Sequence, residues 1–266
     1  MRRFLLLLAL LLCALTPTSL AVGNLYIDGR PVDLSATVLS NTTYVSLRTM
    51  TEVLRPDSSI SWGNGQVTVR AGRFTLSAAP GNLYLEANGR TLFAPLGVLV
   101  KNGHVLVPVR TLAAALDAKV AWDAKSGNTL ITSGSGAIVS AGSFYDSSSL
   151  YWLSHIISAE SQSEPMTGKI AVGNVVLNRV ASSEFPNTIH DVIFDGRWGG
   201  QFEPVRNGTI NLTPTAESIV AAKLVLEGAN VAGSSLYFLA PSLTSNHWIM
   251  QNQTYVMTIG SHWFYQ

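Results

Sequence analysis

One glutamate in the second half of the chain has the position that acid catalysis requires. The residues before it carry an apolar stripe at helical spacing, formed by Leu150, Leu153, Ile156 and Ile157. Glu160 follows Ile156 by four residues and Ile157 by three, so on a helix its side chain shares that stripe. Burial raises the pKa of a carboxyl group, and an acid that stays protonated near neutral pH can protonate the leaving oxygen of a glycosidic bond. The alternatives are that Glu160 ends the helix facing solvent or pairs with Arg179.

A second carboxylate would extend the choice of glycosidase chemistry. Retaining enzymes hold two carboxylates about 5 Å apart, and inverting enzymes about 6.5 to 9.5 Å apart. The candidates in this half are Glu164, Glu184, Asp191, Asp195 and Glu203. None of them stands in a pattern typical of a nucleophile pair. Glu164 precedes Pro165 and is expected at an exposed helix end, with a place at the substrate cleft as the alternative.

The elements that would position Glu160 are helices, followed late in the chain by short strands. A helix from Thr167 to Ala181 is apolar nearly all round, which is typical of a central helix, so its polar residues need partners inside the domain. Those residues are Asn174, Asn178 and Arg179. Further helices are predicted at 189–194 and from an N-cap at Thr213 to Gly228, and strands at 235–239, 254–259 and 262–265. This order predicts an α+β domain with a mainly helical core.

The first half of the chain contains an internal duplication. Residues 44–50 return at 106–112, residues 60–62 return at 120–122, and residues 28–30 return at 88–90, so the offset stays between 60 and 62. Each copy predicts strands that lead into a short helix, with an Asn-Gly hairpin signal at Asn102-Gly103. The expected product is one β-rich α+β domain of two similar units.

Two pairs of side chains recur in the duplicated units. Arg48 and Arg110 lie where a strand meets a helix and are expected to bond nearby carbonyls, with anion binding to a wall polymer as the alternative. Trp62 and Trp122 are expected to pack in the core, with stacking on sugars as the alternative.

The first 21 residues have the pattern of a secretory signal peptide. Arg2 and Arg3 precede an apolar run over 4–15, and Ser19-Leu20-Ala21 supplies small residues for cleavage. The apolar run is too short to span a bilayer, so no membrane span is expected in the mature chain. Cys13 is the single cysteine, and Leu11 and Leu12 before it favour secretion over a lipid anchor. The mature chain therefore has no disulfide, thiol nucleophile or cysteine zinc cluster.

Composition restricts the partners and the layout. The chain is 47% hydrophobic and 12% charged, with 17 Lys plus Arg against 16 Asp plus Glu, so it supplies a large core and no general footprint for nucleic acid. Residues 133–149 hold seven serines and three glycines, a composition typical of a linker. The predicted layout is a signal peptide (1–21), the duplicated domain (22–133), a Ser/Gly-rich linker (134–149) and the domain with Glu160 (150–266).

Residues 151–266 resemble the catalytic domain of the SleB-type cell wall hydrolases, the spore-cortex-lytic enzymes. The resemblance rests on the stretches 159–165, 168–180, 185–186, 201–202, 221–228, 235–238 and 259–265, which follow one another in the family's order. Ala159 stands where the family usually has glycine, and Ser161-Gln162-Ser163 replaces Ala-Arg-Gly, so one arginine of the pattern is absent.

This resemblance implies a lysozyme-like fold that cleaves peptidoglycan glycan strands, usually as a lytic transglycosylase, in remodelling of the cell wall or spore cortex. It places the catalytic acid at Glu160. Such an enzyme can use one glutamate, first as the acid and then as the base for the sugar's own 6-hydroxyl, which closes a 1,6-anhydro ring. Substrate-binding candidates in the matching stretches are Gln201, Tyr237, Phe202 and His262, with Glu164 as a further one. No cofactor and no metal is expected.

The first half resembles the copper amine oxidase N-terminal-like domain of secreted Gram-positive proteins. The resemblance rests on residues 107–123 and on their weaker first copy. It implies a non-catalytic, wall-associated module. Copper sites need several histidines and His104 is the only one in this half, so no copper is predicted.

Three other functions stay open from the sequence. A muramidase would use water in place of the 6-hydroxyl. A zinc-dependent wall amidase or peptidase would need clustered ligands, and the sequence has no H-x-x-x-H or H-E-x-x-H run. A wall-binding protein without catalytic activity is the third. For the enzyme, the predicted location is secreted or associated with the cell wall.

Overall fold

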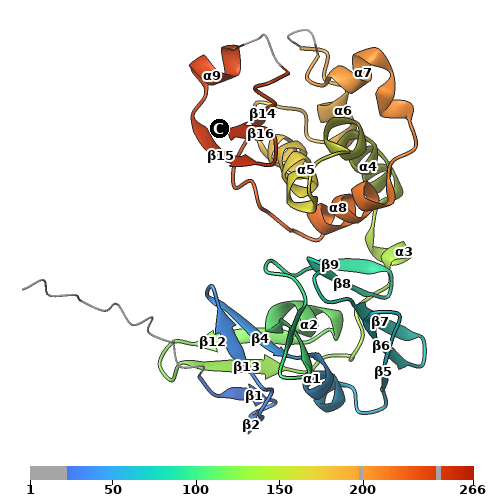
Figure 1. Cartoon of the computed structure of the whole chain (residues 1–266), viewed down its shortest axis with the longest axis vertical. Coiled ribbons are helices and arrows are strands. Elements are labelled where there is room, and N and C mark those ends of the chain that lie inside the picture. The colour runs from blue at the N-terminus through green and yellow to red at the C-terminus, as the bar shows by residue number, and fades with distance from the viewer. Residues whose placement is uncertain (1–22, 198–199, 244–246) are drawn as a thin grey trace, which may run out of the picture.

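The computed structural model describes residues 23–197, 200–243 and 247–266, which form two domains joined by the short helix α3 (Ala141–Phe144) (Figure 1). The predicted signal peptide, residues 1–21, lies outside the described residues. The first domain is rich in strands, and the second is mainly helical with three short strands late in the chain. The predicted fold class is confirmed. In the described part of the chain, no helix is both long and apolar enough to cross a membrane.

Three sheets build the N-terminal domain. One has the order β12–β13–β1–β2, formed by Lys119–Asp123, Asn128–Thr132, Leu25–Ile27 and Arg30–Pro31. The next has the order β10–β11–β4–β3, formed by Leu99–Lys101, His104–Pro108, Thr42–Ser46 and Thr37–Leu39. The third has the order β5–β6–β7–β8–β9, formed by Ser59–Gly63, Gln66–Ala71, Phe74–Ala78, Tyr84–Ala87 and Arg90–Phe93. Two short helices, α1 (Leu47–Leu54) and α2 (Val109–Ala115), follow β4 and β11 directly.

The strand register shows how the two copies are related. Val45 of β4 pairs with Val107 of β11, and the neighbouring pairs are Ser46 with Leu106 and Tyr44 with Pro108. Val45 and Val107 are equivalent positions of the duplication, so this antiparallel pairing is symmetric about them. The two copies are therefore related by an approximate two-fold axis through the Val45–Val107 pair, and the predicted duplication is confirmed.

The two copies also exchange strands. The terminal hairpin of the second copy, β12–β13, pairs with β1 of the first copy, in parallel. The corresponding hairpin of the first copy, β5–β6, is joined through β7 to β8–β9 of the second copy. Both outer sheets thus contain strands from both units. One buried core, to which Leu47, Leu76 and Leu112 belong, lies between the elements of the two copies.

Of the two predictions for the duplicated side chains, the one for the arginines is confirmed and the one for the tryptophans is wrong. Arg48 donates to the Ile60 carbonyl (3.5 Å) and Arg110 to the Val120 carbonyl (3.0 Å), as expected for residues that bond nearby carbonyls. The tryptophans are not in the core: Trp62 is 59% exposed and Trp122 is 57% exposed. Each lies two residues beyond a partly buried residue, Ile60 or Val120, at the end of its hairpin, where the strand has passed the edge of the core.

The C-terminal domain is arranged around α5 (Met166–Ala181). The helices packed on it are α4 (Ser147–Ser161), α6 (Ile189–Ile193) and α8 (Ala216–Leu226). The described residues also form α7 (Glu203–Asn207), a 3₁₀ turn at Thr209–Asn211 and α9 (Trp248–Asn252). The sheet has the order β14–β16–β15, formed by Tyr237–Leu239, His262–Tyr265 and Tyr255–Ile259. The expected N-cap at Thr213 is wrong, because Thr215 caps α8 through the Ser218 amide.

The polar residues of α5 find the internal partners that the sequence requires. Asn174 donates to the Ala229 carbonyl (2.6 Å) and accepts from the Val231 amide (2.8 Å). Asn178 donates to the carbonyls of Gly233 and Ser235, both at 2.9 Å. These bonds fix the segment between α8 and β14 along one side of the central helix.

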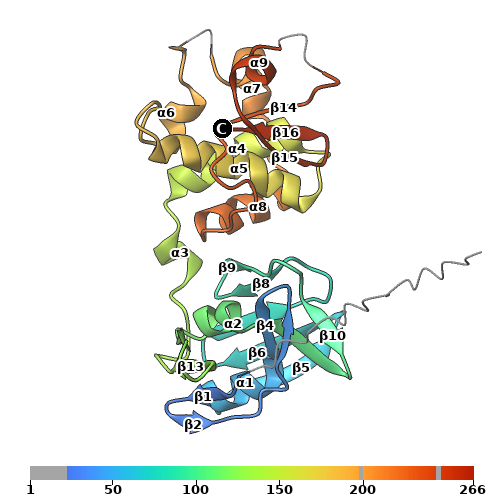
Figure 2. The same ribbon diagram turned by 90° about the vertical axis from the view of Figure 1, so that its left-hand side faces the viewer.

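The two domains contact each other through β9 and α8, which face one another in Figures 1 and 2. Arg90 of β9 makes two hydrogen bonds to Glu227, Nε to Oε1 (2.7 Å) and Nη2 to Oε2 (2.6 Å), and both side chains are nearly buried. Tyr145 donates to the same carboxylate (2.7 Å), and the Phe144 ring lies 3.4 Å from the Arg90 guanidinium. Part of the predicted linker is thus packed between the domains, and Ile138 belongs to the N-terminal core.

Candidate active site

Glu160 lies near the C-terminal end of helix α4, at the edge of the core of the C-terminal domain. Asp146 begins the helix by accepting from the Ser149 amide (2.7 Å), and the first turns expose polar residues to solvent. Leu153, Ile156 and Ile157 are fully buried, as the predicted stripe requires. Glu160 lies in the last turn of the helix and is half-buried, which agrees with the expectation that the apolar stripe removes it from water.

The surroundings of Glu160 favour the protonated acid. Burial raises the pKa of its carboxyl group to about 7, and the negative charge of Glu203 on α7 adds to this rise, while the positive charge of Arg179 opposes it. Among the described residues Glu160 forms no ion pair, so the alternative of a salt bridge with Arg179 is wrong. A carboxyl group that titrates near neutral pH is suited to both donating and accepting a proton there.

Arg179 is the buried cation of this region. Its Nε donates to the Leu236 carbonyl (2.7 Å), and its guanidinium lies 5.0, 5.1 and 5.6 Å from the ring centres of three aromatic residues. Those residues are Phe185, Phe202 and Tyr237. Burial lowers the pKa of Arg179 to about 10, so the cation persists at neutral pH. Its Nη1 has no hydrogen-bond partner among the described residues.

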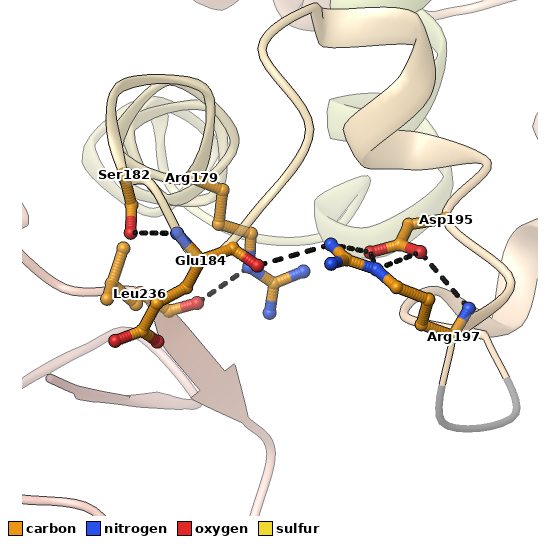
Figure 3. A network of polar contacts seen from close by, with 6 residues as sticks. All are labelled: Arg179, Ser182, Glu184, Asp195, Arg197 and Leu236. Atoms are coloured by element: carbon orange, nitrogen blue, oxygen red, sulfur yellow. Dashed lines mark hydrogen bonds and ion pairs between the residues drawn. The ribbon is translucent and has the colours of Figure 1, made fainter.

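A second arginine fixes the carboxylate that faces this cation. Arg197 binds Asp195 through Nε (2.9 and 3.0 Å) and Nη2 (2.7 Å), and it also donates to the Glu184 carbonyl (3.2 Å). Figure 3 shows the Arg179 guanidinium between Leu236 and this Asp195–Arg197 pair. The hydrogen bonds from Arg197 hold the pKa of Asp195 below its usual value, so Asp195 is an anion and not a second acid.

A hollow of about 370 Å³ lies beside α7. Phe194, Asp195, Gln201, Phe202 and Val205 are among the residues that line it. Glu203, whose charge reaches Glu160, directly follows two of these residues in the chain. The hollow therefore adjoins the helix whose Glu203 acts on the candidate acid, and it offers polar and aromatic groups to a sugar.

The structure gathers three of the predicted substrate-binding residues in this region. Gln201 is half-buried in the hollow, and Tyr237 is half-buried beside Arg179. Phe202 reaches both the hollow and Arg179 but is 2% exposed, so its ring contributes chiefly to packing. For Gln201 and Tyr237 a role in substrate binding stays a prediction; for Phe202 the burial favours a supporting position.

Glu164 and His262 form a separate cluster with Ser261. The Glu164 carboxylate accepts from the Ser261 amide (3.1 Å) and from its hydroxyl, and His262 Nδ1 lies 3.8 Å away. Burial acts to raise the pKa of Glu164, but the hydrogen bonds from Ser261 outweigh it and lower the pKa. The expected exposed helix end is wrong, because Glu164 is 8% exposed. Its contacts fix the β15–β16 turn, which does not favour direct substrate binding.

The backbone at this turn is shaped to the Glu164 carboxylate. Gly260 has φ +59°, and a β-carbon there would lie 1.7 Å from Glu164 Oε2. Glycine is therefore required both by the conformation and by the close approach of the carboxylate. Burial also lowers the pKa of His262, which is 7% exposed, so its imidazole is neutral at pH 7. The side chain is thus part of the packing around this turn.

The N-terminal domain does not offer donors for copper. His104, its single histidine, is exposed at the start of β11. Across the described residues, no three His, Cys, Asp or Glu side chains are close enough together to hold a metal ion. These residues do not fit a copper centre, which needs several nitrogen or sulfur donors in one place.

The sequence singles out Glu160 as the candidate acid, but it does not predict which residues surround it. Arg179 was expected to need internal partners, but its aromatic surroundings come from three segments that are distant along the chain. In the sequence Glu203 is one of five possible second carboxylates, and no pattern marks Phe194. An arginine within an almost wholly apolar helix was the one local signal of a buried charge near the acid.

Each half of the chain matches a known protein family. Residues 163–265 match the Cell Wall Hydrolase family, and residues 26–132 match the copper amine oxidase N-terminal domain. Glu160 lies three residues before the first of these spans. The spore cortex-lytic enzyme of Bacillus cereus is 34% identical over 120 residues, which are 45% of this chain and 45% of that protein. The enzyme of the same name from Oceanobacillus iheyensis is 30% identical over 139 residues, 52% of this chain and 49% of that protein.

The chain thus spans about half the length of the curated relatives that it matches. A solved structure, the catalytic domain of the germination-specific lytic transglycosylase SleB from Bacillus anthracis, is 34% identical to this chain, with a TM-score of 0.43 over 48% of this chain and 100% of that one. The chain thus carries a cell wall hydrolase domain that follows a copper amine oxidase N-terminal domain.

Proposed function

We propose that the C-terminal domain cleaves the glycan strands of peptidoglycan as a lytic transglycosylase, in remodelling of the cell wall or the spore cortex. The observation that carries the proposal is the position of Glu160, a half-buried residue at the edge of a helical core, where burial raises the pKa of its carboxyl group to about 7. Glu164, four residues away, has a lowered pKa. The surroundings of the two residues thus differ, so that Glu160 can act as an acid while Glu164 stays ionised.

Glu160 gives one proton to the leaving group and then takes up another from the 6-hydroxyl, so it ends the reaction as it began. Protonated Glu160 donates to the glycosidic oxygen, the bond from that oxygen to C1 breaks, and positive charge develops at C1. The Glu160 carboxylate then removes the proton from the 6-hydroxyl of the same sugar, and O6 bonds to C1 to form the 1,6-anhydro ring. Arg179 stabilises the carboxylate stage through its charge, because its attraction opposes the rise in the Glu160 pKa.

One observation supports a second candidate, a muramidase that uses water. The charge of Glu203 reaches Glu160, and the Glu203 side chain is exposed and paired with Arg206. A carboxylate in that position could orient a water molecule in place of the 6-hydroxyl.

Product analysis separates the two reactions. Purified peptidoglycan digested by the full chain is expected to release muropeptides with 1,6-anhydro ends, detected by mass spectrometry. Glu203→Gln serves as the matched variant, because it is expected to leave these products unchanged. Products with only reducing ends, lost in Glu203→Gln, would replace the transglycosylase by the muramidase.

The pH profile tests the acid independently of the product. Glu160 must be protonated in the free enzyme, so kcat/KM is expected to be highest below about pH 7 and to fall about tenfold per unit above it. Since Glu203 raises the Glu160 pKa, Glu203→Gln is expected to move this limb to lower pH. A profile whose upper limb lies at the same pH in Glu203→Gln, or well away from pH 7, would contradict the assignment.

The proposed location follows from the same activity. A glycan-cleaving enzyme must reach the wall, and residues 1–21 have the sequence pattern of a signal peptide. We therefore place the mature chain outside the cytoplasmic membrane, in contact with the wall.

A further inference from the structure

The duplicated N-terminal domain presents the same pair of side chains twice on its surface. Trp62 and Trp122 are each more than half exposed, which is uncommon for the largest aromatic side chain. Trp62 lies on β5 opposite Val67, and Trp122 lies on β12 opposite Thr129, so the two indoles occupy equivalent places on equivalent hairpins. Both copies thus place a tryptophan on the surface at the same point of the hairpin, where its ring is accessible for stacking on a ligand.

An arginine accompanies each tryptophan in the same way. Arg48 donates to the carbonyl two residues before Trp62, and Arg110 donates to the carbonyl two residues before Trp122. These bonds hold each guanidinium beside the strand that carries the indole. Arg48 also pairs with Glu52 (3.3 Å), a contact that Arg110 lacks because Ala114 stands at the equivalent position. Arginine has five N–H donors, so both side chains, which are exposed, keep donors for a ligand.

We propose that these two pairs, Trp62 with Arg48 and Trp122 with Arg110, are glycan-binding sites that hold the enzyme on peptidoglycan. The indole of each site stacks on the apolar face of a sugar ring, and the guanidinium binds free carboxylates of the wall's peptide groups. The choice of glycan rests on the proposed function, because a wall-cleaving domain in the same chain makes its substrate the polymer at hand.

The local geometry and charge suit such a ligand. A β-carbon at Gly127 would lie 3.8 Å from the Trp122 ring, so this indole lies near the turn of its own hairpin. Residues 22–133 carry ten Lys and Arg against seven Asp and Glu, an excess that favours a polymer with carboxylates. The Arg90–Glu227 contact then keeps the catalytic domain next to the bound strand.

Binding to insoluble peptidoglycan tests the inference directly. The full chain is mixed with purified sacculi freed of other wall polymers, and the bound fraction is measured by sedimentation, in the Glu160→Gln background so that the sacculi stay intact. Each of Trp62→Ala and Trp122→Ala is expected to weaken binding about two- to tenfold, and the double variant by at least the product of the two effects. Trp62→Phe with Trp122→Phe should restore most of the affinity, because the ring is kept.

Val100→Ala is the matched control, because Val100 is an equally exposed apolar residue of the same domain, 58% exposed. It should bind as the parent chain does, and the melting temperature of every variant should stay unchanged, since the tryptophans contribute little to the core. The inference is overturned if the parent chain does not sediment with sacculi, or if the double Trp variant binds as well as Val100→Ala.

Cleavage of short soluble glycan fragments separates this inference from the proposed function. With Glu160 intact, the Trp variants are expected to cleave such fragments at the parent rate. If the chain binds through the tryptophans but cleaves nothing, the proposed function fails and the binding sites stand. If it cleaves fragments normally and the tryptophans do not affect binding, the reverse holds.

Discussion

Glu160→Gln is expected to lower the rate of glycan cleavage at least about a hundredfold, which is the usual scale of general acid catalysis. The amide keeps the shape of the side chain and removes the proton that the reaction transfers. The fold should remain intact, because the described structure gives the Glu160 carboxylate no hydrogen bond or ion pair to lose. The rate is measured on purified peptidoglycan, with release of soluble fragments as the readout.

The stability of the same variant gives an independent check. A carboxyl group whose pKa is raised by folding stabilises the native state below its unfolded pKa, near 4.5, and loses that contribution as pH rises through about 7. Glu160→Gln removes this loss, so the variant should be more stable than the parent above pH 7. Glu164→Gln is the control: it disturbs the Ser261 contacts, so it should lower the melting temperature. Full activity in Glu160→Gln with none in a folded Glu164→Gln would move the acid to Glu164.

Arg90→Met is expected to destabilise the contact between the domains by about 3–5 kcal/mol, the usual cost of removing one partner of a buried ion pair. The variant leaves the Glu227 carboxylate nearly buried, with Tyr145 as its remaining donor. Because the pair joins β9 to α8, the loss should uncouple the domains, and a single thermal transition should separate into two. Calorimetry of the full chain measures both effects.

Arg48→Met is the matched control for that result. Arg48 forms an ion pair with Glu52 in which both side chains are more than half exposed, and such pairs contribute less than about 1 kcal/mol. The double variant Arg90→Met with Glu227→Met should recover most of the lost stability, since no buried charge is left without a partner. Equal melting behaviour of Arg90→Met and Arg48→Met would show that the interface does not depend on this pair.

Local patterns predicted the parts of the site that one helix determines. The apolar stripe predicted Glu160 at the edge of the core, and the apolar surface of α5 predicted that Asn174 and Arg179 would bond to groups inside the domain. The surroundings that tune the acid could not be predicted, because Arg179 contacts rings from residues 185, 202 and 237, which only the tertiary fold brings together. The role of Glu203 depends in the same way on where α7 packs.

The N-terminal domain shows the same limit in another form. Self-similarity of the sequence predicted the duplication, and the Asn-Gly turn was recovered at Asn102 and Gly103, both with positive φ. The tryptophans were misplaced because residues 60 and 62, like 120 and 122, share one face of a strand, and the pattern does not tell where the core ends along that face. The exchange of strands between the copies could not be predicted either, because no local sequence pattern specifies the copy with which a hairpin pairs.

That exchange has a consequence for how such a domain can exist. A single copy would lack the strands that complete its outer sheets, because β1 receives β13 and β8–β9 receive β5–β7 from the other copy. It could satisfy those edges only by pairing with a second molecule about the axis that passes between Val45 and Val107. The tandem copies thus have the arrangement of an intertwined homodimer whose two subunits are joined in one chain. Such a chain folds independently of its own concentration, and each half can acquire its own ligand contacts.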